Sequence, residues 1–117
     1  MPIFSKLHNL FYVNKVKVIP ESIYDLLTPV AFAHLIMGDG NYSSKGIALC
    51  TDSYGVEDVV RLMNVLIIRY DLKCTLQKKN DNYRIYISRR SMEKVRSIVK
   101  PHMVPSMYYK LGINALD

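Results

Sequence analysis

Hydrophobic and polar positions follow two different periods along this chain, one typical of helices and the other of strands. Apolar residues recur at three- and four-residue steps over 56–70 and again over 92–99, which predicts two amphipathic helices. Strict alternation over 72–79 and over 83–90 predicts two strands, because successive strand side chains point to opposite faces. The polar turn 80–82 joins them into a hairpin. The longer helix is predicted to bury Val56, Val59, Val60, Met63, Leu66, Ile67 and Tyr70.

A further helix is predicted to begin at Thr28, where a capping hydroxyl precedes a proline at the first helical position. It continues through apolar residues and ends at Gly38-Asp39-Gly40. Residues 41–51 then indicate a short hairpin with a polar turn at 43–46. We interpret residues 1–27 as an N-terminal arm and residues 28–117 as a single domain.

The resulting order of helix, hairpin, helix, hairpin and helix predicts an α+β fold in which both hairpins join one antiparallel sheet. Helices would cover the inner face of that sheet. Its outer face would carry Lys73, Thr75, Gln77, Arg84, Tyr86 and Ser88, with Lys79 near one end. A β-surface rich in cationic and hydrogen-bonding side chains can lie in the DNA major groove. The alternative is a plain solvated face, which antiparallel sheets often have.

The charge balance of the chain favours an acidic partner. Its 117 residues include 16 Lys and Arg against 10 Asp and Glu, for a net charge of +6. Such a surplus suits nucleic acid or an anionic surface. Because every apolar run is shorter than the roughly 20 residues that span a bilayer, we expect no membrane partner. We expect the two cysteines to be free thiols, and the three scattered histidines lack the spacing of a zinc site.

Asp39 is an unusual acid for so basic a chain, since it ends an apolar helix between two glycines. Glycine on both sides leaves room for another backbone, a metal ion or a phosphate to approach. Metal-assisted chemistry on a polyanion is one reason to hold a carboxylate there. An ordinary turn after a helix is the other, and the residues alone leave both open.

Five segments, in the same order along nearly the whole chain, resemble those of a LAGLIDADG homing endonuclease domain. Residues 32–40, Phe-Ala-His-Leu-Ile-Met-Gly-Asp-Gly, occupy the nine motif positions. The others are Leu-Thr-Pro at 27–29, Leu-Cys-Thr-Asp-Ser-Tyr at 49–54, the hairpin from 77 to 87, and Pro-Ser-Met-Tyr-Tyr-Lys-Leu at 105–111. The details resemble the second half of organellar, intron-encoded, two-domain members.

This resemblance implies a site-specific endonuclease that cuts both strands of double-stranded DNA with Mg²⁺, in a dimer of LAGLIDADG units. It implies that Asp39 binds the metal beside Gly38, and that Lys110 polarises water or stabilises charge. Asp52 stands where many members have a glutamine that organises water, so it is a third catalytic candidate. The resemblance also suggests DNA contacts by Asn41, Tyr42 and Lys45. The implied dimer interface comprises Ala31, His34, Leu35 and Gly38.

The identity of the second unit stays open. A homodimer would favour a palindromic target. However, His34 replaces a glycine that lets motif helices approach closely, so an unlike half with a small residue opposite it would also fit. Two other functions are compatible with the family: an RNA-binding maturase that assists splicing of its intron, and a half-domain inactive without its partner. Family resemblance further implies a mitochondrial location, in the matrix.

Overall fold

The computed structural model describes residues 12–13, 16–17, 19, 22–52 and 54–113. Its main sheet has four antiparallel strands in the order β3-β4-β6-β5, with β3 and β5 at the edges. The strand bounds are β3 Gly40–Ser43, β4 Gly46–Leu49, β5 Cys74–Lys79 and β6 Asn82–Ile87. A small separate hairpin joins β1 Tyr12–Val13 to β2 Val16–Lys17. The predicted α+β fold, with both hairpins in one sheet, is therefore confirmed.

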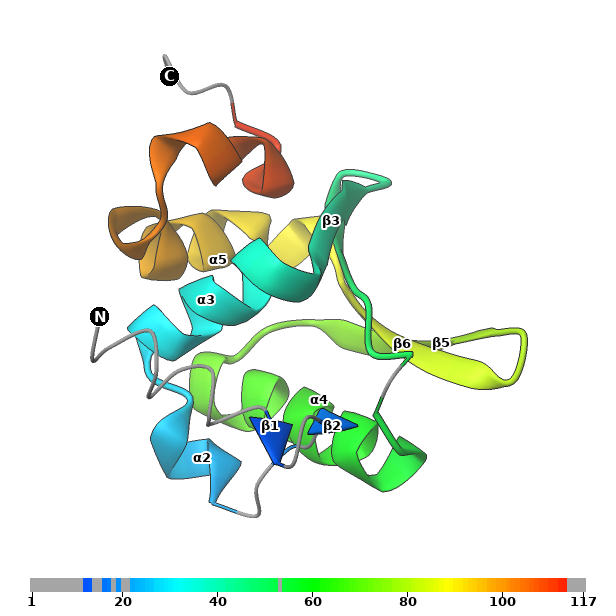
Figure 1. Cartoon of the computed structure of the whole chain (residues 1–117). Coiled ribbons are helices and arrows are strands. Elements are labelled where there is room, and N and C mark those ends of the chain that lie inside the picture. Colours follow the sequence, from blue (N-terminus) through cyan, green and yellow to red (C-terminus); the bar gives the residue numbers. More distant parts are fainter. Residues whose placement is uncertain (1–11, 14–15, 18, 20–21, 53, 114–117) are drawn as a thin grey trace.

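The helices pack against the sheet and against one another (Figure 1). α3 lies between α5 and the pair formed by α2 and α4, while the β5–β6 hairpin extends beyond the helices. In the part of the chain that is described, no helix is both long and apolar enough to cross a bilayer. The helical bounds are α2 Ile23–Leu26, α3 Pro29–Asp39, α4 Val56–Tyr70, η1 Arg89–Ser91, α5 Met92–Val99, η2 Lys100–His102 and η3 Pro105–Leu111.

Helix α3 begins as its sequence predicts. The Thr28 hydroxyl accepts a hydrogen bond of 3.2 Å from the Ala31 N–H, and Pro29 occupies the first turn. The apolar side chains that follow are buried around most of the helix, including Phe32, which is fully buried. A helix that is apolar on most sides must lie inside the fold. Helix α3 is accordingly the central element of the core.

The segment before Thr28 joins the same core. Ile19, Ile23 and Leu27 are each at most 3% exposed and belong to the cluster that contains Phe32. The Phe32 and Tyr70 rings stack at 5.4 Å. Ile19, Ile23 and Leu27 of the predicted arm are thus packed into the domain, while residues 1–11, 14–15, 18 and 20–21 lie outside the described residues.

Hydrogen bonds fasten this segment to α4. Arg61 Nη1 donates to the Ile19 carbonyl at 3.0 Å, and the Tyr70 hydroxyl donates to the Leu27 carbonyl. Burial raises the pKa of the Tyr70 hydroxyl. At neutral pH Tyr70 therefore remains protonated and able to donate.

The buried face of α4 differs from the predicted one. Val56 and Ile67 are 50% and 38% exposed, whereas Leu62 and Val65 are buried. The helix contacts both β6 and α2, so its buried arc is turned toward the side that α2 covers. Periodicity identified the helix correctly, but it could not show that α2 packs against α4 and shifts its buried face.

The two glycines around Asp39 predict opposite responses to alanine. An ideal Cβ at Gly40 would lie 2.7 Å from the Ile36 carbonyl oxygen, whereas one at Gly38 would have no atom within 4 Å. We expect Gly40→Ala to destabilise the fold by about 1–3 kcal/mol through overpacking. The control, Gly38→Ala, should be neutral or stabilising by about 0.5 kcal/mol because alanine is the better helix former.

Urea unfolding at matched, low protein concentration measures both effects. Equal stabilities of the two variants would contradict the close approach of Gly40 to α3.

Candidate functional site

Asp39 lies at the junction of helix and sheet. It is the last residue of α3, and β3 begins at the next residue. The Gly40 N–H donates to the Ile36 carbonyl, and the Asp39 carbonyl accepts from the Cys50 N–H at 2.8 Å. The half-buried Asp39 is therefore held by the end of the helix and by the strand next to β3. The neighbouring Gly38 is exposed, with open space where a side chain would lie.

Lys110 is brought to the same end of α3 from the far end of the chain. Its ammonium donates to the Met37 carbonyl at 2.6 Å, across 73 residues of sequence. Carbonyls in the last turn of a helix lack helical partners and carry partial negative charge, so a lysine is favoured there. Arg96 on α5 holds the end of η3 by donating to the Leu111 carbonyl at 2.9 Å. The structure thus gathers two of the three predicted catalytic residues around one helix end.

Asp52, the third predicted catalytic residue, forms an ion pair with Arg84. Arg84 Nε donates to Asp52 Oδ1 at 3.0 Å, and Nη2 donates to Oδ2 at 2.7 Å. This two-bond geometry is the strongest that arginine makes with a carboxylate. The hydrogen bond to Asp52 raises the pKa of Arg84 further above its usual range. Sequence reasoning identified both residues separately, but their pairing depends on strand register.

The outer face of the sheet has the predicted composition. Lys73, Thr75 and Gln77 are exposed, and Arg84, Tyr86 and Ser88 are half-buried. Thr75 pairs with Tyr86 and Gln77 with Arg84 across β5 and β6. Asn41 and Tyr86 both pair with Ala48 on β4, so the row continues from β3 to β5. Lys79 pairs with Asn82 at the far end of the hairpin.

Lys45 lies in the turn between β3 and β4. Ser44 and Lys45 both have left-handed backbone conformations, with φ of 51° and 67°, as a tight two-residue hairpin turn requires. The Tyr86 hydroxyl donates to the Ser44 carbonyl at 2.9 Å, which ties this turn to the sheet. Lys45 is exposed at the tip and can reach a ligand beside the sheet.

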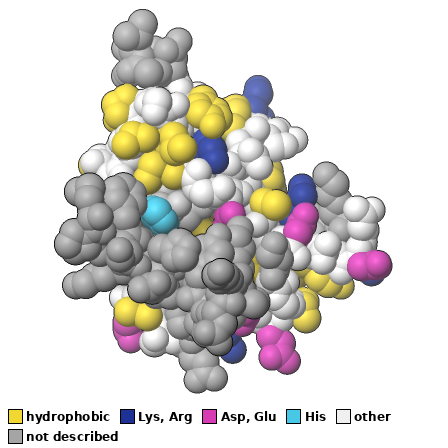
Figure 2. Space-filling view, viewed as in Figure 1, with side chains coloured by type: hydrophobic (Ala, Val, Ile, Leu, Met, Phe, Trp, Pro, Cys, Tyr) yellow, Lys and Arg dark blue, Asp and Glu magenta, His cyan; other side chains and the backbone are white. Residues whose placement is uncertain are grey.

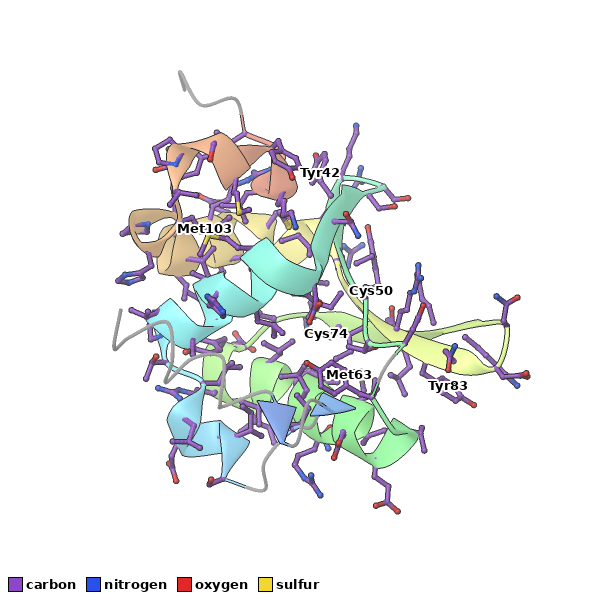
Figure 3. The ribbon with its side chains drawn as sticks, in the orientation of Figure 1. Tyr42, Cys50, Met63, Cys74, Tyr83 and Met103 are labelled. Atoms are coloured by element: carbon purple, nitrogen blue, oxygen red, sulfur yellow. The ribbon has the colours of Figure 1, made fainter. Side chains whose placement is uncertain are left out.

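Tyr42 lies differently from the other predicted DNA contacts. Its register partner is Ile47, which is buried on the core face, because alternate strand residues point to opposite sides. Figure 3 shows Tyr42 beside the C-terminal segment, and an ideal Cβ at Gly112 would lie 2.5 Å from its ring. Tyr42 is 41% exposed, yet its contact supports the segment that carries Lys110.

The predicted dimer interface is only partly on the surface. Ala31 and Leu35 are 1% and 2% exposed within the chain's own core, whereas His34 is half-buried and Gly38 is exposed. The open side of α3 is rotated toward Met37, because the core takes the side that carries Ala31 and Leu35. His34, Met37, Gly38, Val104 and Met107 line a hollow of about 310 Å³, which we call the α3 hollow. Figure 2 shows hydrophobic side chains gathered over the C-terminal segment on this side.

Asp39 offers one carboxylate that a divalent metal ion could bind, with the remaining ligands still to be supplied. Carboxylate oxygens and water are the ligands that Mg²⁺ prefers, and Asp39 with the open space at Gly38 offers both. Within the described residues, no group of three or more His, Cys, Asp or Glu side chains could hold a metal ion. Burial raises the pKa of the Cys74 thiol to about 12, which disfavours the thiolate form that binds metals.

Comparisons with known proteins agree with this geometry. The LAGLIDADG DNA endonuclease family matches residues 1–95. The intron-encoded endonuclease ai4 of Dictyostelium discoideum is 42% identical over 94% of this chain and 71% of its own length. The cytochrome b mRNA maturase bI2 of Debaryomyces hansenii is 39% identical over 93% of this chain, but only 42% of its own length.

A solved structure supports the same assignment. The homing endonuclease I-WcaI bound to its DNA recognition sequence matches with a TM-score of 0.78 and 29% identity. The match covers 92% of this chain and 51% of that one, so this chain spans about half of that homing endonuclease. Fold, motif order and sequence similarity agree: the chain belongs to the LAGLIDADG DNA endonuclease family.

Proposed function

We propose that this chain is one unit of a site-specific DNA endonuclease that cuts both strands of its target. The observation that carries the proposal is that Lys110 bonds the Met37 carbonyl in the last turn of α3, two residues before Asp39, where β3 enters the sheet. A carboxylate and an ammonium beside a cationic β-surface suit hydrolysis of a phosphodiester. The structural relative that was solved with its DNA recognition sequence supports this substrate.

The outer face of the sheet would bind the DNA. Exposed amide, hydroxyl and cationic groups along β5 and β6 can donate to base edges and phosphates. The net charge of +6 would strengthen the attraction to any duplex. Lys45 and Lys73, at two ends of this surface, are placed to contact phosphates.

Asp39 would hold Mg²⁺, with the Gly38 side left open for water or a phosphate oxygen. When bound, the metal would supply a water of lowered pKa and offset charge on the phosphate. The Lys110 ammonium bonds the Met37 carbonyl and can donate a further hydrogen bond to a water molecule or to a phosphate oxygen. Its fixed ammonium adds positive charge where negative charge develops.

A second unit would complete the site. The α3 hollow is lined by Val104, Met107 and the exposed side of α3, including Gly38 next to Asp39, and it would face that unit. The partner would be a second copy or an unlike half, and the half-length match to the solved relative supports a two-unit enzyme. Relatives encoded in introns or named for cytochrome b mRNA support an organellar origin, and we propose the mitochondrial matrix.

Replacing Asp39 tests the metal role. Asp39→Asn keeps the shape of the side chain but removes its charge, so cleavage of a library of duplex targets with Mg²⁺ should fall by about 100-fold or more. Binding to the selected target should persist. Asp81→Asn, an equal charge change at the exposed hairpin turn, is the control and should cleave like the parent. Unchanged cleavage by Asp39→Asn would refute the mechanism.

Replacing Lys110 tests the auxiliary role separately. Lys110→Met keeps the length of the side chain but removes the ammonium and its bond to the Met37 carbonyl. We expect kcat to fall by about 100-fold with little change in DNA affinity. Lys94→Met is the control, because Lys94 is exposed and pairs with Asp71 away from this helix end. Equal losses in kcat for the two variants would contradict the assignment.

Splicing assistance is the second candidate, because two close relatives are named cytochrome b mRNA maturases. The basic surface needed for structured RNA is similar, and phosphate contacts dominate both affinities. As an endonuclease, the chain should bind its selected duplex more tightly than host-intron RNA in filter binding at one fixed salt concentration. Tighter RNA binding with faster intron splicing and no DNA cleavage would favour the maturase.

A further inference from the structure

The ion pair between Asp52 and Arg84 places a negative charge on a surface that otherwise attracts DNA. Their side chains are 35% and 27% exposed, so water reaches both. Two-bond pairs of arginine with a carboxylate are an exception among exposed ion pairs, because their geometry holds the planar guanidinium in one place. Whatever the pair adds to folding stability, it fixes the position of Arg84 and offsets its charge.

Arg84 occupies a defined place next to Asp39. The register that pairs Leu49 with Ile85 puts Cys50 opposite Arg84, and the Cys50 N–H bonds the Asp39 carbonyl. Figure 3 shows Cys50 between the end of α3 and the β5–β6 hairpin. Two strand spacings separate Asp39 from Arg84, or about 10 Å. Arg84 is thus within reach of phosphates close to the proposed cleavage centre.

An unpaired arginine at that place would bind the phosphates of any sequence, because phosphate contacts carry no base information. Asp52 prevents this in two ways. Both of its oxygens accept from Arg84, which occupies Nε and Nη2, and its charge offsets that of the guanidinium. The planar group is also held in one orientation, with Nη1 outside the two-bond contact.

We propose that Asp52 is a specificity-determining residue that acts through Arg84, an inference that rests on the DNA-binding function proposed above. It limits the contacts of Arg84 with phosphates of any DNA sequence and holds the guanidinium in the orientation that suits the target sequence. In this proposal Asp52 positions Arg84 and does not organise water, which is the role that family resemblance suggested. The acid at this position lowers the affinity for non-target DNA and so raises the ratio of target to non-target affinity.

The test uses the full chain and a random-sequence 30-base-pair duplex, with EDTA present and KCl varied between 50 and 200 mM. Released from the Asp52 carboxylate, Arg84 should add about one phosphate contact in Asp52→Asn, which steepens the slope of log affinity against log salt by about 0.9. Binding to this duplex should tighten about tenfold at 50 mM. The ratio of target to random-duplex affinity should fall by a similar factor.

Three further variants separate the pair from simple charge removal. Asp81→Asn removes one carboxylate charge from the β5–β6 hairpin that carries Arg84, and it should keep the parent slope. Arg84→Gln and the double variant Asp52→Asn/Arg84→Gln should share one slope, because no arginine remains to be released. Asp52→Ser should repeat the Asp52→Asn result, and urea unfolding checks that each variant folds.

The possible failures are distinguishable. If the parent binds duplex DNA but Asp52→Asn matches Asp81→Asn, the inference about Asp52 is wrong and the proposed function stands. The inference is equally wrong if removing Asp52 steepens the slope in the Arg84→Gln background. If the parent shows no salt-dependent DNA binding, the proposed function fails and this inference fails with it.

Discussion

The close approach of Gly40 to the last turn of α3 determines where the other site residues lie. Because the Gly40 N–H bonds the Ile36 carbonyl, the chain leaves the helix directly as a strand, without a loop. Asp39 then ends one rigid element and directly precedes another. Its position is set by a buried helix on one side and by the Cys50 hydrogen bond on the other. Rigid elements hold a functional group more precisely than loops do.

The C-terminal segment depends on the same junction. Lys110 bonds a carbonyl in the last turn of α3, while Tyr42, two residues beyond Gly40, packs against Gly112. Both contacts are made at the C-terminal end of η3, so that end is positioned by the helix and by β3. Loosening the junction would therefore displace the carboxylate and the ammonium relative to each other. The positions of Asp39, of the cationic sheet face and of the α3 hollow therefore depend on one another.

Much of this arrangement could be predicted from sequence, because local rules agreed with the fold. Thr28-Pro29 fixed the start of α3, and strand alternation identified the outer face. Long-range facts could not be predicted in the same way. The Asp52–Arg84 pair depends on register across 32 residues, and the burial of Ala31 and Leu35 depends on how α3 is rotated against its neighbours. The burial of Ile19, Ile23 and Leu27 in the core likewise needed tertiary contacts that no local pattern encodes.

The strand order leaves β5 at an edge of the sheet, where unpaired backbone groups can template the addition of a strand from another molecule. The end of β5 reads Gln77-Lys78-Lys79, and charged residues on an edge oppose such pairing. Two copies brought together edge to edge would set lysine against lysine. The lysines proposed to attract nucleic acid therefore also oppose edge-to-edge growth of this protein into β-aggregates.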